Sequence, residues 1–191
     1  MKKIILFLIL FLGLESNINA DTKRIVSGNQ AAKIIIIVYE SLTCGHCADF
    51  HKNIYPQLKK DYLDTGLAKI EFRHFPLDAA AFNAAKVTQC KKNQGLEILE
   101  SLYSNQHKWV KGNTIEQVND NLKKFIYEAG FEVDFEKCIN NKKIEDFILN
   151  DRIEGVKKFK VNATPTIIIN DEKFEKSLNY KNLKKTLKKL I

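Results

Sequence analysis

The sequence predicts an α/β fold that is interrupted by an inserted all-helical subdomain. Strand signals stand near its two ends: a β-branched run covers residues 33–39, a second strand signal covers 67–75, and a third comes only at 166–169. From residue 78 to about 159 the apolar residues recur at helical spacing instead. We therefore expect a single domain over residues 21–191, with a helical insertion at about 78–159.

The first part of the chain predicts a strand, a helix and a second strand. Residues 33–39 are apolar at almost every position, which is typical of a strand buried on both faces. Pro56 predicts a kink in the helix that follows, and Gly66 is placed to end it. The two strands should be parallel, joined by a right-handed crossover. The apolar residues at helical spacing are Phe50, Ile54, Leu58 and Tyr62.

Polar residues mark the ends of the later elements. Thr114 with Gln117 forms a capping box, and Asp134 can cap a short helix. Strand 166–169 is followed by turn residues and a short partner strand around residues 173–174. A last amphipathic helix is expected after Asn179.

The first 20 residues have the pattern of a secretory signal peptide. Lys2 and Lys3 precede an apolar run from Ile4 to Leu14, and a polar segment follows that ends at Ala20. The run is shorter than the ~20 residues that a membrane-spanning helix needs. We expect cleavage after Ala20 and a soluble protein outside the cytoplasm, in a bacterial periplasm.

Composition argues against nucleic acid as the partner. The net charge is +8, but the lysines are spread along every polar face rather than gathered in one patch. The chain is 45% hydrophobic, so it can bury a core without disulfides to hold it. Its four cysteines therefore need a chemical explanation.

The pair Cys44 and Cys47 lies where the first buried strand turns into a helix. Unpaired backbone N–H groups and the helix dipole at such a start stabilise an anionic sulfur, so Cys44 is the expected nucleophile. Cys47, one turn later, should be the more buried thiol that resolves a mixed disulfide. Gly45 and His46 stand between them, and His46 is expected to stabilise the Cys44 thiolate by a hydrogen bond or by positive charge.

Two other interpretations of this pair were weighed. Half of a zinc site would need a second close pair of ligands, whereas Cys90 and Cys138 stand alone. A purely structural bridge across two residues would remove little chain entropy. We therefore predict a redox-active disulfide, with no metal and no cofactor.

These residues resemble a known family. The segment from Tyr39 to His51, YESLTCGHCADFH, is similar to the active-site region of DsbA-like thiol:disulfide oxidoreductases of the thioredoxin superfamily, and FRHFPLD at 72–78 and Thr164-Pro165-Thr166 match it in order and spacing. The resemblance implies a thioredoxin fold and a cis Pro165. It also implies that Thr164 and Pro165 bind an extended segment of substrate.

The resemblance also implies partners, and the chain differs from the family at one position near the CxxC pair. It implies folding or unfolded exported proteins as substrates and a DsbB-like, quinone-linked membrane protein as the reoxidant. Family members often carry an acidic residue where this chain has Val38. Glu40 points to the same face of the strand, where it either substitutes for that acid or is simply solvated.

Other residues are expected to be structural. His51 is expected on a helix surface and His74 in a strand, and Trp109 is expected in the core rather than lining a peptide groove. Members of the family often hold a second, non-catalytic disulfide where Cys90 and Cys138 stand. We expect that bridge, the alternatives being two buried free thiols and a second redox-active pair.

The function expected from the sequence is an exported protein-disulfide oxidoreductase that introduces disulfide bonds into folding proteins. The nearest rival is a disulfide isomerase or reductant on the same fold, and the rival from another class is a CxxC metal-binding module. The reduction potential, the substrates, the redox partner and the oligomeric state do not follow from the sequence.

Overall fold

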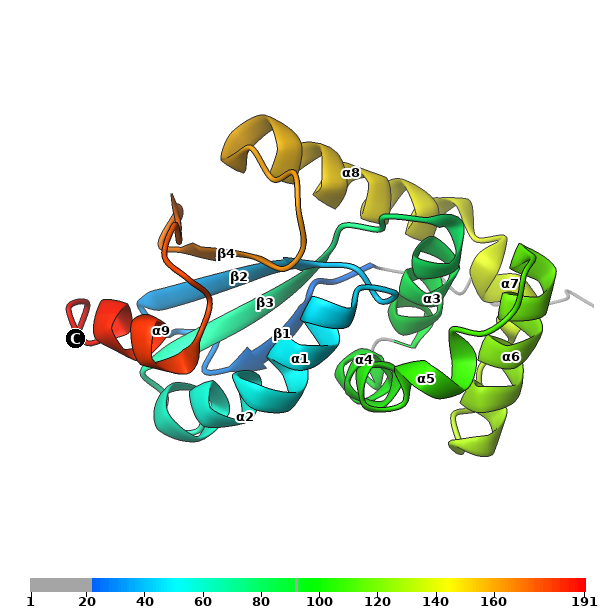
Figure 1. Ribbon diagram of the computed structural model, residues 1–191, viewed down its shortest axis with the longest axis horizontal. Helices are drawn as coiled ribbons and strands as arrows, with labels where there is room; N and C mark the ends of the chain where they lie inside the picture. The colour runs from blue at the N-terminus through cyan, green and yellow to red at the C-terminus, as the bar shows by residue number, and fades with distance from the viewer. Residues whose placement is uncertain (1–21, 92) are drawn as a thin grey trace, which may run out of the picture.

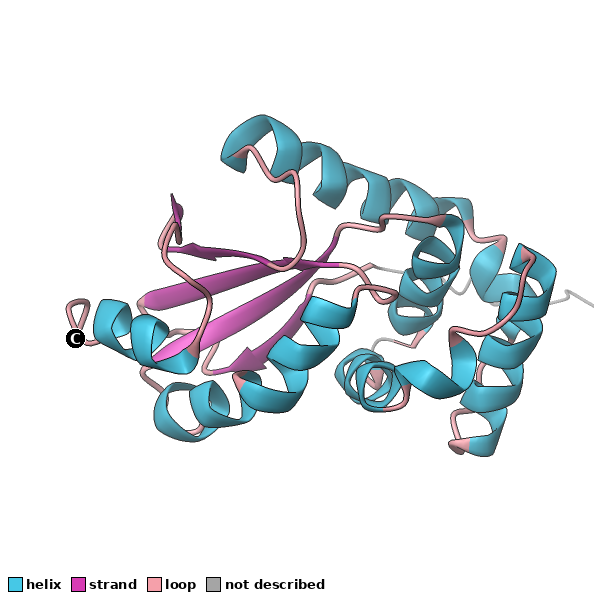
Figure 2. Cartoon of the chain, viewed as in Figure 1, coloured by secondary structure: helices cyan, strands magenta, loops and turns pink. Residues whose placement is uncertain are grey.

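The computed structural model describes residues 22–91 and 93–191, so the predicted signal peptide over residues 1–20 lies outside the described residues. One five-stranded sheet runs through the middle of the molecule (Figures 1 and 2), with the strand order β1-β3-β2-β4-β5. The strands are β1 (Ile25–Gly28), β2 (Ile34–Glu40), β3 (Ala68–His74), β4 (Thr166–Ile169) and β5 (Glu172–Lys173).

The predicted parallel pair is confirmed and forms the centre of the sheet. β2 pairs with β3 in parallel, from Ile34 opposite Ala68 to Glu40 opposite His74. β4 joins β2 antiparallel, and Asn170 and Asp171 at positive φ turn the chain into β5. β4 therefore brings residues from the far end of the sequence beside the strand that leads to Cys44.

The sequence analysis missed β1. This strand has four residues, pairs antiparallel with β3 and lies at the edge of the sheet. A run this short, ended by Gly28 at positive φ, has too few alternating residues to be told from a polar lead-in. Its pairing with β3 decides its structure.

The helix after Cys44 breaks where Pro56 predicted a kink. The helical hydrogen bonding of the first segment ends at Asn53, and Pro56 lies in the first turn of the next segment, where its missing N–H is tolerated. The helices of the chain are α1 (Gly45–Asn53), α2 (Tyr55–Leu58), the π-helical turn η1 (Lys59–Leu63), α3 (Ala79–Cys90), α4 (Gly95–Ser104), α5 (Gln106–Trp109), α6 (Ile115–Glu128), α7 (Phe135–Ile139), α8 (Lys142–Phe159) and α9 (Tyr180–Leu187).

The sheet separates two apolar layers, because successive side chains of β2 point to opposite faces. Ile36 and Val38 belong to the larger core with α1, α2 and α9, whereas Ile37 and Tyr39 pack on the other side with Phe159 at the end of α8. Figure 1 shows α8 on one side of the sheet and α1, α2 and α9 on the other. The backbone of α8 approaches the sheet closely at Gly155, where an added Cβ would lie 2.7 Å from the Tyr39 ring.

All the described residues from Ala79 to Phe159 that are in regular structure are helical. Trp109 is fully buried and donates its indole N–H to the Leu102 carbonyl, so the prediction that it is a core residue is confirmed. Cys90, at the end of α3, and Cys138, in α7, form a disulfide. The bridge ties the first helix of this segment to a helix 48 residues later.

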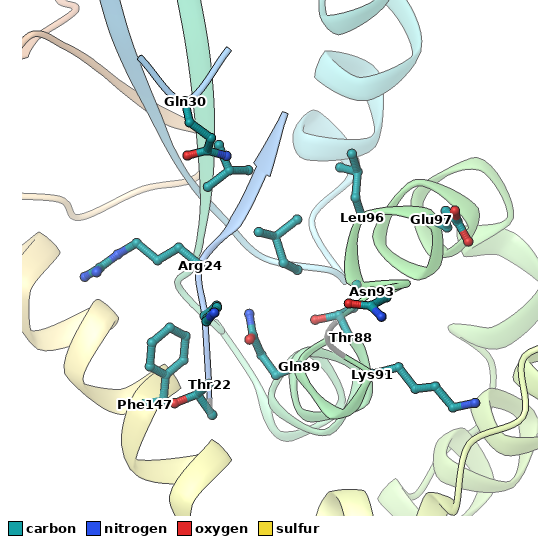
Figure 3. Close-up of a pocket in the computed structure, with 14 residues that line it drawn as sticks. Thr22, Arg24, Gln30, Thr88, Gln89, Lys91, Asn93, Leu96, Glu97 and Phe147 are labelled. Carbon is teal, nitrogen blue, oxygen red and sulfur yellow. The ribbon is translucent and has the colours of Figure 1, made fainter. Parts of the chain in front are cut away.

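A hollow of about 700 Å³ lies between β1 and the α3–α4 junction (Figure 3). Arg24 extends from this region towards α8, where its guanidinium donates to Asp151 Oδ1 at 2.9 Å and to Glu154 Oε2 at 3.2 Å. None of the residues that the sequence singles out for chemistry lines this hollow. It is therefore separate from the site around Cys44.

Within residues 22–91 and 93–191, no helix is long and apolar enough to cross a membrane.

We predict that replacing both Cys90 and Cys138 by alanine lowers the free energy of unfolding by ~4 kcal/mol, because the disulfide restricts the unfolded chain over a loop of this length. Urea denaturation of the unmutated and double-variant chains measures the difference. Reducing the disulfide of the unmutated chain should remove most of this difference in unfolding free energy. Reduction keeps both sulfur atoms, so it separates the effect of the cross-link from the effect of losing them. Equal unfolding free energies before and after reduction would contradict the prediction.

Candidate functional site

Cys44 occupies the N-cap position of α1. β2 ends at Glu40, and after the turn Ser41–Thr43 the Cys44 backbone is still extended, with φ −79° and ψ 121°, while its carbonyl already accepts the first helical bond from Ala48. The unpaired N–H groups of the first helical turn are therefore next to its sulfur. Gly45 is exposed and starts the helix, and an added Cβ there would touch nothing within 4 Å.

The two thiols of the CxxC pair have different environments. Cys44 is partly exposed, whereas Cys47 is fully buried, and both are free thiols in this structure. Burial raises the pKa of Cys47 far above its usual range, and the negative charge of Glu40 raises it further. One sulfur can thus be reached from solvent while the other is held protonated behind it.

The loop before β4 lies against Cys44. The Thr164–Pro165 peptide bond is cis, and the Cys44 thiol donates a hydrogen bond to the Thr164 carbonyl at 3.4 Å. Thr166 fixes the loop by donating from its hydroxyl to the Ala163 carbonyl at 2.7 Å. Two segments 120 residues apart in sequence are therefore in contact at the Cys44 sulfur. The expectation of a cis Pro165 is confirmed.

His46 does not form the hydrogen bond to Cys44 that was one of its two expected roles. Its side chain is exposed on the first turn of α1, and within the described residues the only hydrogen bond of the Cys44 thiol goes to Thr164. His46 instead lines an open pocket of about 660 Å³ beside the site. The other lining residues include the apolar side chains of Phe50, Ile54, Pro165, Leu178 and Tyr180.

The expectation that His51 lies on a helix surface is wrong. The residue is only 8% exposed, and its Nε2 lies 2.8 Å from Oε2 of Glu40, which is itself 1% exposed. The alternative that Glu40 is solvated is therefore also wrong. The His51 ring stacks on Tyr103 of α4 at a centroid distance of 4.1 Å, because α4 of the helical segment covers this part of α1. The spacing of four residues from Cys47 could have shown that His51 shares the buried stripe of the helix.

Glu40 is a buried carboxyl facing the CxxC pair. Burial raises its pKa above the ordinary value of 4.5, and the neighbouring His51 partly opposes that shift. Burial also raises the pKa of Tyr103, with further contributions from the charges of Glu40 and Cys47. The carboxyl, the phenol and the buried thiol are thus electrostatically coupled.

The helical segment holds the turn that carries Cys44. The side chain of Gln106, in α5, donates to the carbonyl of Leu42 at 2.8 Å and to that of Cys44 at 3.2 Å. Thr43 donates to Asp78 Oδ2 at 2.7 Å, and Asp78 also caps α3. No pattern in the sequence indicated Gln106, since its partners are backbone atoms more than 60 residues away.

Residues 22–91 and 93–191 contain no group of three or more His, Cys, Asp or Glu side chains placed to hold a metal ion.

We predict that the Glu40→Gln variant changes how stability depends on pH. Because the pKa of Glu40 is raised in the folded chain, the unfolded chain loses this proton first, near pH 4.5, and the unfolding free energy falls as the pH rises above that value. Glutamine removes this fall, so the variant should gain stability relative to the unmutated chain from about pH 4.5 upwards. Denaturant unfolding from pH 4 to 8, with the cysteines reduced, measures it.

The Glu136→Gln variant provides the control for this measurement, because it makes the same change of side chain at an exposed position. A difference between the Glu40→Gln variant and the unmutated chain that stays constant from pH 4 to 8 would contradict the prediction.

Comparison with known proteins places this site in a family. The thioredoxin family model matches residues 20–189. The crystal structure of α-DsbA1 from Wolbachia pipientis superposes with a TM-score of 0.77 and 31% sequence identity, over 88% of this chain and 90% of that one. Disulfide bond formation protein D of Bacillus subtilis is 23% identical over 86% of this chain and 75% of its own length.

Longer relatives also match. A protein of Rickettsia typhi, provisionally named a protein-disulfide oxidoreductase, is 28% identical over 78% of this chain and 56% of its own length. The chain spans only 54 to 62% of the length of three such Rickettsia proteins. The chain therefore belongs to the thioredoxin family, and within it to the DsbA-like thiol:disulfide oxidoreductases.

Proposed function

We propose that the chain is an exported thiol oxidase, which donates the disulfide between Cys44 and Cys47 to folding proteins. The observation that carries the proposal is the contrast between the two sulfurs. Cys44 is reachable at the start of a helix, while Cys47 is fully buried one turn later. Such a pair lets a substrate react with one sulfur only, and keeps the second ready to close or reopen the disulfide.

The proposed reaction is two successive thiol–disulfide exchanges. A substrate thiolate attacks the Cys44 sulfur of the disulfide form, the bond between Cys44 and Cys47 breaks, and Cys47 leaves as a thiolate that takes up a proton. A second substrate thiolate then attacks the first substrate sulfur, which releases Cys44 as a thiolate. The substrate has lost two electrons and gained a disulfide, and the CxxC pair has been reduced to the dithiol.

Glu40 is proposed as the proton acceptor and donor of Cys47. A buried carboxyl with a raised pKa can take up a proton and return it. Its negative charge raises the pKa of Cys47, so the protonation of each group depends on the charge of the other. Glu40 would thus stand in for the acid that the family has at the position of Val38.

Thr164, Pro165 and the pocket beside them are proposed to hold the substrate. The Thr164 carbonyl already accepts a hydrogen bond from the Cys44 thiol, so a substrate sulfur bonded to Cys44 would lie beside this backbone. Main-chain pairing there would recognise extended segments of many proteins. The neighbouring pocket offers apolar walls at Phe50, Ile54 and Leu178, which suit an apolar side chain of the substrate. His46, on its rim, would act on the thiolate through charge.

Export and reoxidation complete the proposal. The pattern of residues 1–20 supports a signal peptide cleaved after Ala20 and a periplasmic location. The membership of the DsbA-like family supports reoxidation by a quinone-linked, DsbB-like membrane protein. The alternative, a disulfide isomerase or reductant on the same fold, differs in the form in which the CxxC pair is kept.

We predict that the Cys47→Ala variant, with Cys44 activated as a mixed disulfide, forms a new mixed disulfide between Cys44 and a single-cysteine peptide. The variant should keep this adduct, because no second thiol resolves it. The oxidised unmutated chain should form the same adduct only transiently, and the Cys44→Ala variant should form none. Intact mass measurement follows all three. An adduct on the Cys44→Ala variant, or none on Cys47→Ala, would exclude Cys44 as the nucleophile.

We also predict that half-alkylation of Cys44 occurs at a pH well below neutral, because the start of the helix stabilises its thiolate. A stabilised thiolate in turn makes the disulfide form a stronger oxidant. Iodoacetamide labelling of the Cys47→Ala variant across pH measures it, with free cysteine as the reference. A midpoint near that of free cysteine, together with efficient refolding of a scrambled substrate, would favour the isomerase instead.

A further inference from the structure

Buried polar atoms without a hydrogen-bond partner gather around Cys47. Of the six such side-chain atoms in the described part of the chain, four belong to residues at this site: Glu40 Oε1, His51 Nδ1, Tyr103 Oη and Thr164 Oγ1. The hydroxyls of Tyr103 and Thr164 interact with the Cys47 thiol, which leaves the Glu40 and His51 atoms unpaired. Each buried polar group left unpaired costs ~1–3 kcal/mol, and such groups in a folded protein ask for a functional explanation. The transient passage of a proton is one.

His51 links this cluster to the surface on a separate side of α1. Its Nε2 is hydrogen-bonded to Glu40, and its side chain lines a small pocket of about 230 Å³ together with Tyr55, Lys59, Glu100 and Ser104. That pocket shares no lining residue with the one beside His46 and Pro165. At about 100° per residue, the α1 residues of the two pockets fall on different faces of the helix, with Cys47 between them.

We propose that His51 carries protons between Glu40 and solvent through this small pocket, so that thiols exchange on one flank of α1 and protons on the other. The proposal rests on the proposed function. His51 acts through Glu40 and does not touch the substrate. It is therefore a positioning and relay residue rather than a catalytic one.

The proton balance closes over one full cycle. When Cys47 leaves as a thiolate, Glu40 gives it a proton, His51 replaces that proton from Nε2, and the buried Nδ1 takes one up from water that enters the small pocket. When the dithiol is reoxidised, Cys47 returns its proton to Glu40, Nε2 receives it, and Nδ1 releases the other. Imidazole can hold a proton at either nitrogen, so the two half-reactions restore the starting tautomer without rotation of the ring.

The groups around His51 suit this passage. Glu40 faces it from β2, Cys47 shares its helix, Tyr103 and Glu100 face it from α4, and Tyr55 and Lys59 face it from the segment after α1. The Lys59 ammonium donates a hydrogen bond to Asp64. Among the described residues, Glu40 is the only hydrogen-bond partner of the His51 ring.

The test separates attack by Cys44 from resolution by Cys47. The reduced chain is mixed with oxidised glutathione in a stopped-flow instrument. The phase that depends on glutathione concentration reports adduct formation at Cys44, and the independent phase reports resolution, which needs the Cys47 proton to leave. His51→Gln keeps a hydrogen-bond donor for Glu40 but cannot pass a proton on. It should slow resolution at least about tenfold and leave adduct formation within twofold.

Chemical rescue identifies the proton step. In the His51→Ala variant the space left by the ring joins the small pocket, so added imidazole should restore at least half of the unmutated resolution rate. His74→Gln is the matched control, because His74 is another buried histidine, bonded to Thr88 away from the CxxC pair, and both phases should stay within twofold. If His51→Ala does not fold, the comparison of the two glutamine variants decides the question. Resolution should be slowed selectively in His51→Gln and unchanged in His74→Gln.

Three results overturn the relay: resolution within twofold of the unmutated rate in His51→Gln, equal slowing of both phases, or a folded His51→Ala that imidazole does not restore. The second of these would show a structural role. If the unmutated chain forms no glutathione adduct at Cys44, the proposed function itself fails. If it forms and resolves the adduct while His51→Gln does so equally fast, only the relay fails.

Discussion

The start of α1 immediately after β2 is the constraint on which the rest of the site depends. The chain leaves a central strand, buried at every residue but Ile35, at Glu40 and enters a helix at Gly45, so only four residues make the turn. Three contacts hold this turn: Gln106 donates to the Leu42 carbonyl, Asp78 accepts from the Thr43 hydroxyl, and the Ser41 hydroxyl accepts from the Leu77 N–H. A thiol at the last of these four positions has the helix N-terminus on one side and solvent on the other. Everything else at the site acts on that sulfur or on its partner one turn later.

The sheet and the helical segment bring distant residues to this turn in different ways. β4 pairs with β2 and ends the loop that carries Thr164 and Pro165, so its register places them beside Cys44. The helical segment adds Gln106, which holds the turn, and Tyr103, which covers His51. The insertion therefore does more than enlarge the core. It also contributes Glu100 and Ser104 to the small pocket beside His51.

Local patterns predicted most of the fold. The β-branched run of β2, the helical spacing after Cys47, and the capping residues Thr114, Asp134 and Asn179 each depend on a few neighbouring residues, and the structure has all of them. β1 was missed because an edge strand of four residues has no pattern of its own. At the site, the relative burial of Cys44 and Cys47 follows from helix geometry, and the direction of Glu40 follows from the alternation of side chains along a strand. The pairing of Glu40 with His51 does not, since it requires α4 to cover the histidine.

Asp78 gives the two halves of the molecule a shared carboxylate. Its Oδ1 accepts from the Ala81 N–H and so begins α3, while its Oδ2 accepts from the Thr43 hydroxyl in the turn before Cys44. Because one side chain serves both the first helix of the insertion and the turn, any substitution there alters the folding of one and the geometry of the other together. Stability and thiol reactivity are thus not independent variables at this position, and selection on either one constrains both.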